Sequence, residues 1–379
     1  MPRPISLVLM PDALTHNLRA LRAALPANRR IWAVAKANAY GHGIDLAVSA
    51  FAQADGLAVL DLQEASAARS LGWQKPILML EGLFEPSDVA QAVALDLDLV
   101  FHHPRQLDWW RATKVVRAPL AKGRHWFKFN TGMNRLGFRP DQMNTVQQAC
   151  ADHRAQGISL GFMTHYAQAE VAGATASQLQ SFEMALSQVA RAPEEAISTC
   201  NSAAVWSEIS QDAEWVRPGL SLYGASPFLG PWAFEQSLPP VGHRVVSAEA
   251  LGLLPASELR TEIIAVQQVQ PGAAVGYGGR WRAARPSRIG VVAAGYADGY
   301  PRTAPDGTPV LVGGVHCMLV GQVSMDMITV DLTDHPELDV GSPVALWGAG
   351  LPVDRVAQAC GTSAYELLTA VTSRVPRQL

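Results

Sequence analysis

The stretch Ala33-Val34-Ala35-Lys36-Ala37-Asn38-Ala39-Tyr40-Gly41-His42-Gly43 indicates which fold to expect for the whole chain. An apolar run of buried-strand length, residues 30–35, ends where Lys36 begins. Most lysines are solvated surface charges, but Lys36 follows alanine and valine and has no charged neighbour in the sequence. Apolar surroundings lower the pKa of a lysine, which makes its amine a usable nucleophile or Schiff-base partner. We therefore expect a reactive lysine at the end of a buried strand.

Short apolar runs alternate with helix-forming segments over the first two thirds of the chain. The runs fall at 30–35, 57–60, 77–80, 97–101, 126–129, 160–163, 196–200 and 215–216. A further strand is expected at 5–9, followed by a helix at 12–25, where leucines recur with a helical period. This alternation is typical of a (β/α)8 barrel of the TIM type. We predict such a barrel over residues 10–232.

The pattern changes after Gly230-Pro231. From there the chain has β-type runs separated by glycine and proline, at 245–252, 261–269, 287–294, 309–323, 328–332 and 343–347, and a closing helix at about 352–360. We predict a mostly β domain over residues 233–379, which the strand within residues 1–9 joins.

The composition excludes several classes of protein. A length of 379 residues suits a large barrel with a smaller domain. The net charge of −3, with acids and bases interspersed, argues against nucleic acid or a membrane surface as partner. No apolar run reaches the ~18 residues of a membrane span, and no signal segment is recognisable. The 4 cysteines lack metal-type spacing, so we expect free thiols in a reducing cytoplasm and no metal.

The stretch around Lys36 matches throughout the signature V-[AV]-K-A-[ND]-A-Y-G-H-G, and so resembles the lysine segment of alanine racemases, which are fold-type-III pyridoxal-phosphate enzymes. Further segments that resemble this family follow in the same order, at 126–137, 163–167, 200–204, 216–224, 275–279, 295–302, 321–327 and 365–366. Together they cover nearly the whole chain. The resemblance implies racemisation of L-alanine and D-alanine with pyridoxal 5'-phosphate, in a homodimer with shared active sites.

The resemblance places the cofactor contacts mainly on the barrel. Lys36 would carry the cofactor, and the other contacts would be Tyr40, His165, Asn201, Ser202, Arg217, Gly219, Leu220 and Tyr365. Arg217 would donate to the pyridine nitrogen, and because guanidinium keeps its proton, that nitrogen would stay largely unprotonated. A weaker electron sink favours proton exchange at Cα over transamination. From its position alone, Tyr40 fits a packed aromatic equally well, and a lone His165 fits a structural role.

A second basic segment surrounds Lys128, which lies between two phenylalanines. Family members carry a carbamylated lysine here, an anion that orients the arginine corresponding to Arg135. Arg135 is then expected to contact the cofactor's phenolic oxygen and the substrate carboxylate. A buried lysine–carboxylate ion pair is the alternative for Lys128. Asn130 replaces the usual aspartate, which leaves the local charge balance open.

Other positions also depart from the family pattern. Ser198 stands where the family often has a histidine, so we expect one support of Arg217 to be missing. Gln322 stands where some members have arginine, close to the substrate entrance.

The β domain is expected to complete the active site of the partner subunit. Inversion at Cα needs one base on each face, and the resemblance assigns these roles to Lys36 and to Tyr277 of the other subunit. Four further residues are expected near the site: Met325 and Asp326 against the substrate, and Tyr296 and Arg302 along the entrance.

Two other classes of protein share parts of this pattern. A single-barrel pyridoxal-phosphate carrier has the lysine but no β domain, so the segments around Tyr277 and Asp326 argue against it. A basic amino-acid decarboxylase has both domains but sets an acidic residue against the pyridine nitrogen, so Arg217 argues against it. The sequence leaves open whether serine or larger amino acids are accepted, and whether the role is biosynthetic or catabolic.

Overall fold

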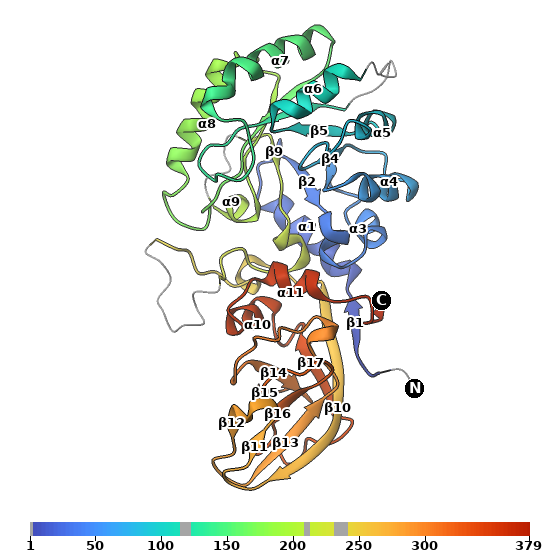
Figure 1. The fold of residues 1–379 in the computed structure, drawn as a ribbon, viewed down its shortest axis with the longest axis vertical. Coiled ribbons are helices and arrows are strands. Elements are labelled where there is room, and N and C mark those ends of the chain that lie inside the picture. The colour runs from blue at the N-terminus through green and yellow to red at the C-terminus, as the bar shows by residue number, and fades with distance from the viewer. Residues whose placement is uncertain (1–2, 114–122, 208–212, 231–241) are drawn as a thin grey trace.

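The chain forms a helix-covered barrel followed by a β-rich part, which lies below the barrel in Figure 1. The structure, a computed structural model, describes residues 3–113, 123–207, 213–230 and 242–379. The predicted domain boundary at 232/233 lies outside the described residues. No described helix combines the length and the apolarity that crossing a bilayer requires.

Eight parallel strands close into the barrel in chain order, and the last pairs with the first. They are β2 (Arg30–Val34), β3 (Gly56–Val59), β4 (Ile77–Met79), β5 (Asp98–Phe101), β6 (His125–Lys128), β7 (Leu160–Met163), β8 (Ala196–Ser198) and β9 (Trp215–Val216). Each predicted run overlaps one of these strands, so the predicted barrel is confirmed. Parallel strands covered on both faces are continuously apolar, which is why short apolar runs were informative.

The barrel helices pack on the outer face of the strands (Figure 1). They are α1 (Pro11–Ala23), α3 (Ile44–Ala50), α4 (Leu62–Ser70), α5 (Asp88–Ala94), α6 (Pro104–Ala112), α7 (Met143–Ala155), α8 (Ala176–Gln188) and α9 (Ser202–Trp206). Tryptophans contribute to the barrel core: the buried Trp32 ring stacks on Trp215 at 4.2 Å and meets Trp126 edge-on at 6.4 Å. This packing rigidifies the strands whose far ends carry the candidate site.

The second part, here called the β domain, is built on an eight-stranded sheet of order β13-β16-β15-β14-β17-β10-β1-β18. The long strand β10 (Ser257–Val269) pairs with β1 (Ser6–Leu9), β13 (Ser287–Val292) and β17 (Pro343–Trp347). The remaining strands are β11 (Ala274–Val275), β12 (Trp281–Arg282), β14 (Pro309–Val312), β15 (Val315–Leu319), β16 (Ile328–Asp331) and β18 (Arg377–Gln378). The first strand of the chain thus lies in the sheet of the β domain.

One expected β run of the β domain is wrong, and another contains two strands. The run 245–252 is not a strand, because Glu249–Leu251 forms a single 3-10 turn that ends at Gly252 with φ 68°. The run 309–323 is a hairpin, because Gly313 and Gly314 have φ values of 57° and 84° and reverse the chain between β14 and β15. Two successive positive φ values are typical of a tight hairpin turn, for which paired glycines are a recognisable signal.

The chain closes with two helices instead of the single one expected. They are α10 (Val353–Ala359), which matches the prediction, and α11 (Ala364–Ala370). The second begins at Ser363, whose side chain accepts a hydrogen bond from the Glu366 amide, a capping arrangement visible in the sequence. Helix α11 contacts α2 (Lys36–Tyr40), and so connects the β domain to the turn that contains Lys36.

Candidate active site

A cavity of about 300 Å³ lies where the barrel strands end. Barrel enzymes gather their reactive groups at this face. Ten of the predicted site residues line the cavity: Lys36, Tyr40, Lys128, Arg135, His165, Asn201, Ser202, Arg217, Gly219 and Tyr365. The fold thus brings together side chains that follow five of the barrel strands and one from α11.

The lining of the cavity is strongly basic. Lys36, Lys128, Arg135 and Arg217 face it, whereas Glu81 is the one carboxylate among the described lining residues. Burial is the largest cause that lowers the pKa of Lys36, followed by Arg135. Burial also lowers the pKa of Lys128 to about 8 and that of Arg217 to about 10. Because desolvated cations of like charge repel, this arrangement is suited to an anionic ligand.

Lys36 begins a tight turn with a left-handed backbone. Residues 37–40 have φ values of 54°, 52°, 52° and 52°, and none is glycine, so each is disfavoured by about 1–2 kcal/mol. Two side chains hold the turn: Glu64 accepts from the Asn38 amide at 2.9 Å, and Asn38 Oδ1 accepts from the Ile44 amide at 3.0 Å. The conformation that presents Lys36 to the cavity is therefore imposed by its surroundings.

Arg217 is only 6% exposed and is held by neutral groups. Its Nη1 donates to Ser198 Oγ, and its Nη2 donates to the Thr164 carbonyl at 2.6 Å and lies 3.4 Å from His165 Nδ1. Our expectation of a missing support is therefore wrong, because the Ser198 hydroxyl accepts one of the guanidinium N–H groups. Burial is the largest cause, and the charge of Arg217 the second, that lowers the pKa of His165 well below its usual value. The imidazole is neutral as a result, and its Nδ1 can accept from the guanidinium.

Tyr40, Ser202 and Gly219 bring hydroxyl and amide groups to the wall of the cavity. Ser202 Oγ accepts from the Gly219 amide at 2.9 Å. A Cβ atom at Gly219 would lie 2.3 Å from the Tyr40 hydroxyl, so only glycine permits this approach. The Tyr40 ring stacks on Tyr223 at 4.5 Å and lies 5.8 Å from Tyr365. These are the neutral donors that a phosphate group requires.

The loop before Arg135 is organised by Asn130. Its Oδ1 accepts from the amides of Gly132 and Asn134 at 3.2 Å and 3.0 Å, and its Nδ2 donates to Asn134 Oδ1 at 3.1 Å. A carboxylate could accept the two backbone N–H groups but could not donate. Asparagine therefore shapes this loop without adding a negative charge beside the cationic cavity.

Six predicted residues do not line the cavity of their own chain. Leu220 is buried behind it, and the others lie in the β domain: Tyr277, Tyr296, Arg302, Met325 and Asp326. Tyr277 is 72% exposed and Met325 is 52% exposed. Within one chain, the structure therefore does not bring Tyr277 to the cavity that contains Lys36.

Sequence reasoning missed two carboxylates near the site. Glu81 lines the cavity, and it is the first charge after a buried strand, the same signal that identified Lys36. Glu64 accepts from both the Asn38 and the Leu60 amides at 2.9 Å. Its spacing from Asp61, which caps α4, follows the pattern of a helix capping box.

The fold and the cavity define a barrel protein of the kind that acts on ligands at the carboxyl ends of its strands. The family described as alanine racemase, N-terminal domain, matches residues 9–227, and alanine racemase, C-terminal domain, matches residues 256–379. These two matches cover both parts of the chain.

Relatives agree over the full length. The alanine racemase of Bordetella petrii is 46% identical over 393 residues, which cover 99% of each chain. That of Cupriavidus necator is 48% identical over 380 residues, or 99% of this chain and 95% of that one. The crystal structure of biosynthetic alanine racemase from Pseudomonas aeruginosa superimposes with a TM-score of 0.89 at 43% identity, covering 99% of both chains. The chain therefore belongs to the alanine racemase family.

Replacing the acceptor beside Arg217 tests the geometry of the site. Ser198→Ala should lower the free energy of unfolding by about 1–3 kcal/mol, because a buried cationic donor loses its partner. Ser187→Ala on the exposed side of α8 is the control and should change it by less than about 0.5 kcal/mol. Denaturant unfolding of both variants is the measurement. Equal effects of the two substitutions would contradict the support that we assign to Ser198.

Proposed function

We propose that the chain interconverts L-alanine and D-alanine with pyridoxal 5'-phosphate as cofactor, and that it acts as a homodimer. The observation that carries this proposal is the basic cavity around Lys36, built from the segments that match the alanine racemase signature. The product D-alanine would serve peptidoglycan synthesis, or the reaction would run toward alanine breakdown. The four buried cysteine thiols favour a reducing compartment such as the cytoplasm.

The residues that are present fit this cofactor. The hydroxyls of Ser202 and Tyr40 would hold its phosphate group, joined by the Gly219 amide once that amide turns from Ser202 Oγ to the phosphate, and the amine of Lys36 would hold its aldehyde carbon. A cavity of about 300 Å³ is at the lower end of the range of small-molecule sites, which suits a single ring with its phosphate. When bound, pyridoxal phosphate stabilises the negative charge that develops at Cα as the substrate loses its α-proton.

Arg217 would favour proton exchange at Cα over transamination. Its pKa of about 10 keeps the guanidinium protonated at neutral pH, so Arg217 can only donate to a ring nitrogen and cannot protonate it. Less charge then spreads into the ring, which favours return of the proton to Cα. Arg135, at the rim of the same cavity, would hold the substrate carboxylate.

The second base would come from another copy of the chain. Inversion needs a proton acceptor on each face of Cα, and the cavity supplies Lys36 for one face. Tyr277 lies on an exposed turn of the β domain whose Gly276 approaches Gln322, and Met325 and Met327, which follow Gln322 in the chain, are 52% and 42% exposed. Large apolar side chains exposed at one surface are typical of an interface. A second copy that covers the cavity with this surface would place Tyr277 opposite Lys36.

We extend the proposal to carbamylation of Lys128. Addition of carbon dioxide needs the neutral amine, and a pKa of about 8 leaves roughly a tenth of the amine neutral at pH 7. Burial and the neighbouring Arg217 and Arg135 cause this lowering, and they outweigh the opposing effect of Glu81. Among the described residues, Lys128 belongs to no ion pair. A carbamate would offset the excess positive charge of the cavity.

The cofactor assignment predicts one labelled lysine. After loading with pyridoxal phosphate, borohydride reduction should attach the cofactor to the peptide that contains Lys36, as mass spectrometry of a digest would show. Incubation with each L-amino acid, followed by chiral chromatography, should give a D-product from alanine. Lys36→Ala should abolish this in both directions, whereas Lys75→Ala, an exposed lysine bound to backbone carbonyls, should not. A label on another lysine would refute the assignment.

The carbamate predicts a dependence on bicarbonate. Enzyme stripped of carbon dioxide should lose activity and regain it when bicarbonate is added. At a fixed concentration of dissolved carbon dioxide, the recovery should slow about tenfold for each pH unit below about 8, because the ammonium form cannot react. Lys128→Ala should be partly rescued by acetate. If neither the bicarbonate effect nor the acetate rescue is seen, Lys128 is not carbamylated.

The shared site predicts complementation between two inactive variants. Lys36→Ala and Tyr277→Phe, mixed under conditions that exchange subunits, should recover up to about a quarter of the wild-type activity, because half of the dimers contain one complete site. In the control mixture, the Tyr277→Phe protein is replaced by the double variant Lys36→Ala/Tyr277→Phe, so that no dimer can contain a complete site. If subunits exchange, as native mass spectrometry can show, and no activity returns, the two bases do not act across the dimer.

A further inference from the structure

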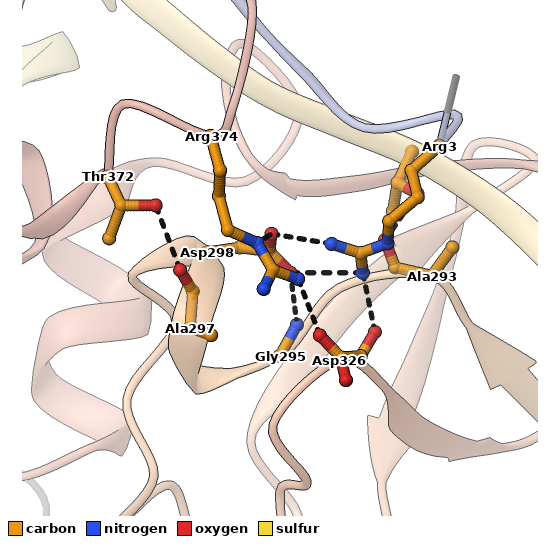
Figure 2. A network of polar contacts seen from close by, with 9 residues as sticks. Arg3, Ala293, Gly295, Ala297, Asp298, Asp326, Thr372 and Arg374 are labelled. Atoms are coloured by element: carbon orange, nitrogen blue, oxygen red, sulfur yellow. Dashed lines mark hydrogen bonds and ion pairs between the residues drawn. The ribbon is translucent and has the colours of Figure 1, made fainter.

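Arg3, Asp298, Asp326 and Arg374 form a closed ring of two cations and two anions (Figure 2). The fully buried Asp298 carboxylate accepts from Arg3 Nη1 at 2.7 Å and from Arg374 Nε at 2.7 Å. Arg374 Nη2 also donates to Asp326 Oδ1 at 2.6 Å, and Arg3 Nη2 donates to the Asp326 carbonyl at 2.6 Å. The ring joins segments near the two ends of the chain to two loops of the β domain.

The two loops are also connected through their backbones. The Tyr296 amide donates to the Ser324 carbonyl at 3.0 Å, and the Ala297 amide donates to the Met325 carbonyl at 3.0 Å. Asp298, the next residue, receives both arginines. The segment 324–327 is therefore held from its backbone and from the Asp326 carboxylate together.

The carboxylates of Asp298 and Asp326 differ in how far they depend on a cationic partner. A fully buried Asp298 must be paired, since an isolated buried charge is very costly. The side chain of Asp326 is 48% exposed, so water could solvate it without any partner. Arg374 nevertheless spans both, using Nε for one and Nη2 for the other, a fork that a lysine cannot reproduce. The consequence of the second contact is orientation of Asp326.

We propose that Arg3 and Arg374 are positioning residues, which hold Asp326, and with it the exposed Met325, in the orientation that meets the partner's active site. This inference rests on the proposed function, in which the segment 324–327 crosses the dimer interface. None of the four ring residues is among the described residues that line the cavity of their own chain. An effect of either arginine on racemisation would therefore pass through this segment or through the turn of Asp298, and variants of Asp326 distinguish the two routes.

Arg374→Gln tests the ring, with Arg285→Gln as the matched control. Arg285 belongs to the same domain and forms an exposed ion pair with Asp334 at 2.5 Å. Arg374→Gln should lower kcat/KM about tenfold, equally for L-alanine and D-alanine and mainly through KM, because a charge-assisted contact is lost. Hydrogen exchange of the peptide spanning 322–327 should become faster. Arg374→Lys should recover only part of the loss, and Arg285→Gln should change neither measurement.

A double-mutant cycle separates positioning from general stabilisation. If Arg374 acts through Asp326, then Arg374→Gln/Asp326→Asn should be no worse than Asp326→Asn alone. Additive losses, an inert Asp326→Asn, or unchanged hydrogen exchange in Arg374→Gln would each overturn the inference. Failure of the proposed function would appear in the unmodified protein, as absence of racemisation. Failure of the ring would appear in the variants alone.

Discussion

Burial of cationic side chains at the carboxyl face of the barrel is the constraint on which the rest of the structure depends. Loss of hydration is the largest cause that lowers the pKa of Lys36, Lys128 and Arg217 alike. Removing such charges from water costs several kcal/mol each unless other groups solvate them. The protein meets this cost at Arg217 with hydroxyls and carbonyls, which orient a guanidinium without cancelling its charge. An anion that enters the cavity therefore finds positive charge that is already ordered.

The groups around Arg217 are themselves fixed from further away. Thr164, whose carbonyl receives the guanidinium, has its hydroxyl 2.7 Å from that of Thr131 and donates to the Phe129 carbonyl at 3.1 Å. Gln178 on α8 donates to the Thr131 hydroxyl at 3.2 Å and to the His165 carbonyl at 3.1 Å. Two of the eight barrel strands and a helix are linked in this way, so the direction of one guanidinium depends on packing across a quarter of the barrel.

The sequence predicts the barrel well because a buried parallel strand is a continuous apolar run, and at several strands the first ionisable residue after it lines the site. Lys36, His165 and Arg217 follow this rule. Glu81 follows it too and was overlooked. The role of Ser198 could not be predicted, because it depends on which way an arginine from the next strand points. In the β domain, half-exposed strands give weaker patterns, which is why the run 245–252 was misjudged.

Tyr277 and the ring around Asp298 expose a different limit of sequence reasoning. An exposed tyrosine has no pattern that tells which surface will cover it, since the surface that we propose to cover Tyr277 belongs to another molecule. The sequence around Arg3 and Arg374 does not indicate their role either, because their shared partner Asp298 lies far from both in the sequence. Only the pairing of β1 with β10 and β18 brings these ends together.

The left-handed turn after Lys36 has a consequence for how activity fails when the protein is perturbed. Residues 37–40 would relax to a right-handed or extended backbone in isolation, since nothing in their own chemistry favours φ near 52°. Their native shape is held by contacts from α4 and α11. Heat or denaturant that loosens these neighbours would release the turn while the barrel strands remain paired. Inactivation would then precede the loss of secondary structure, as a local unfolding event confined to the segment in which we place the reactive lysine.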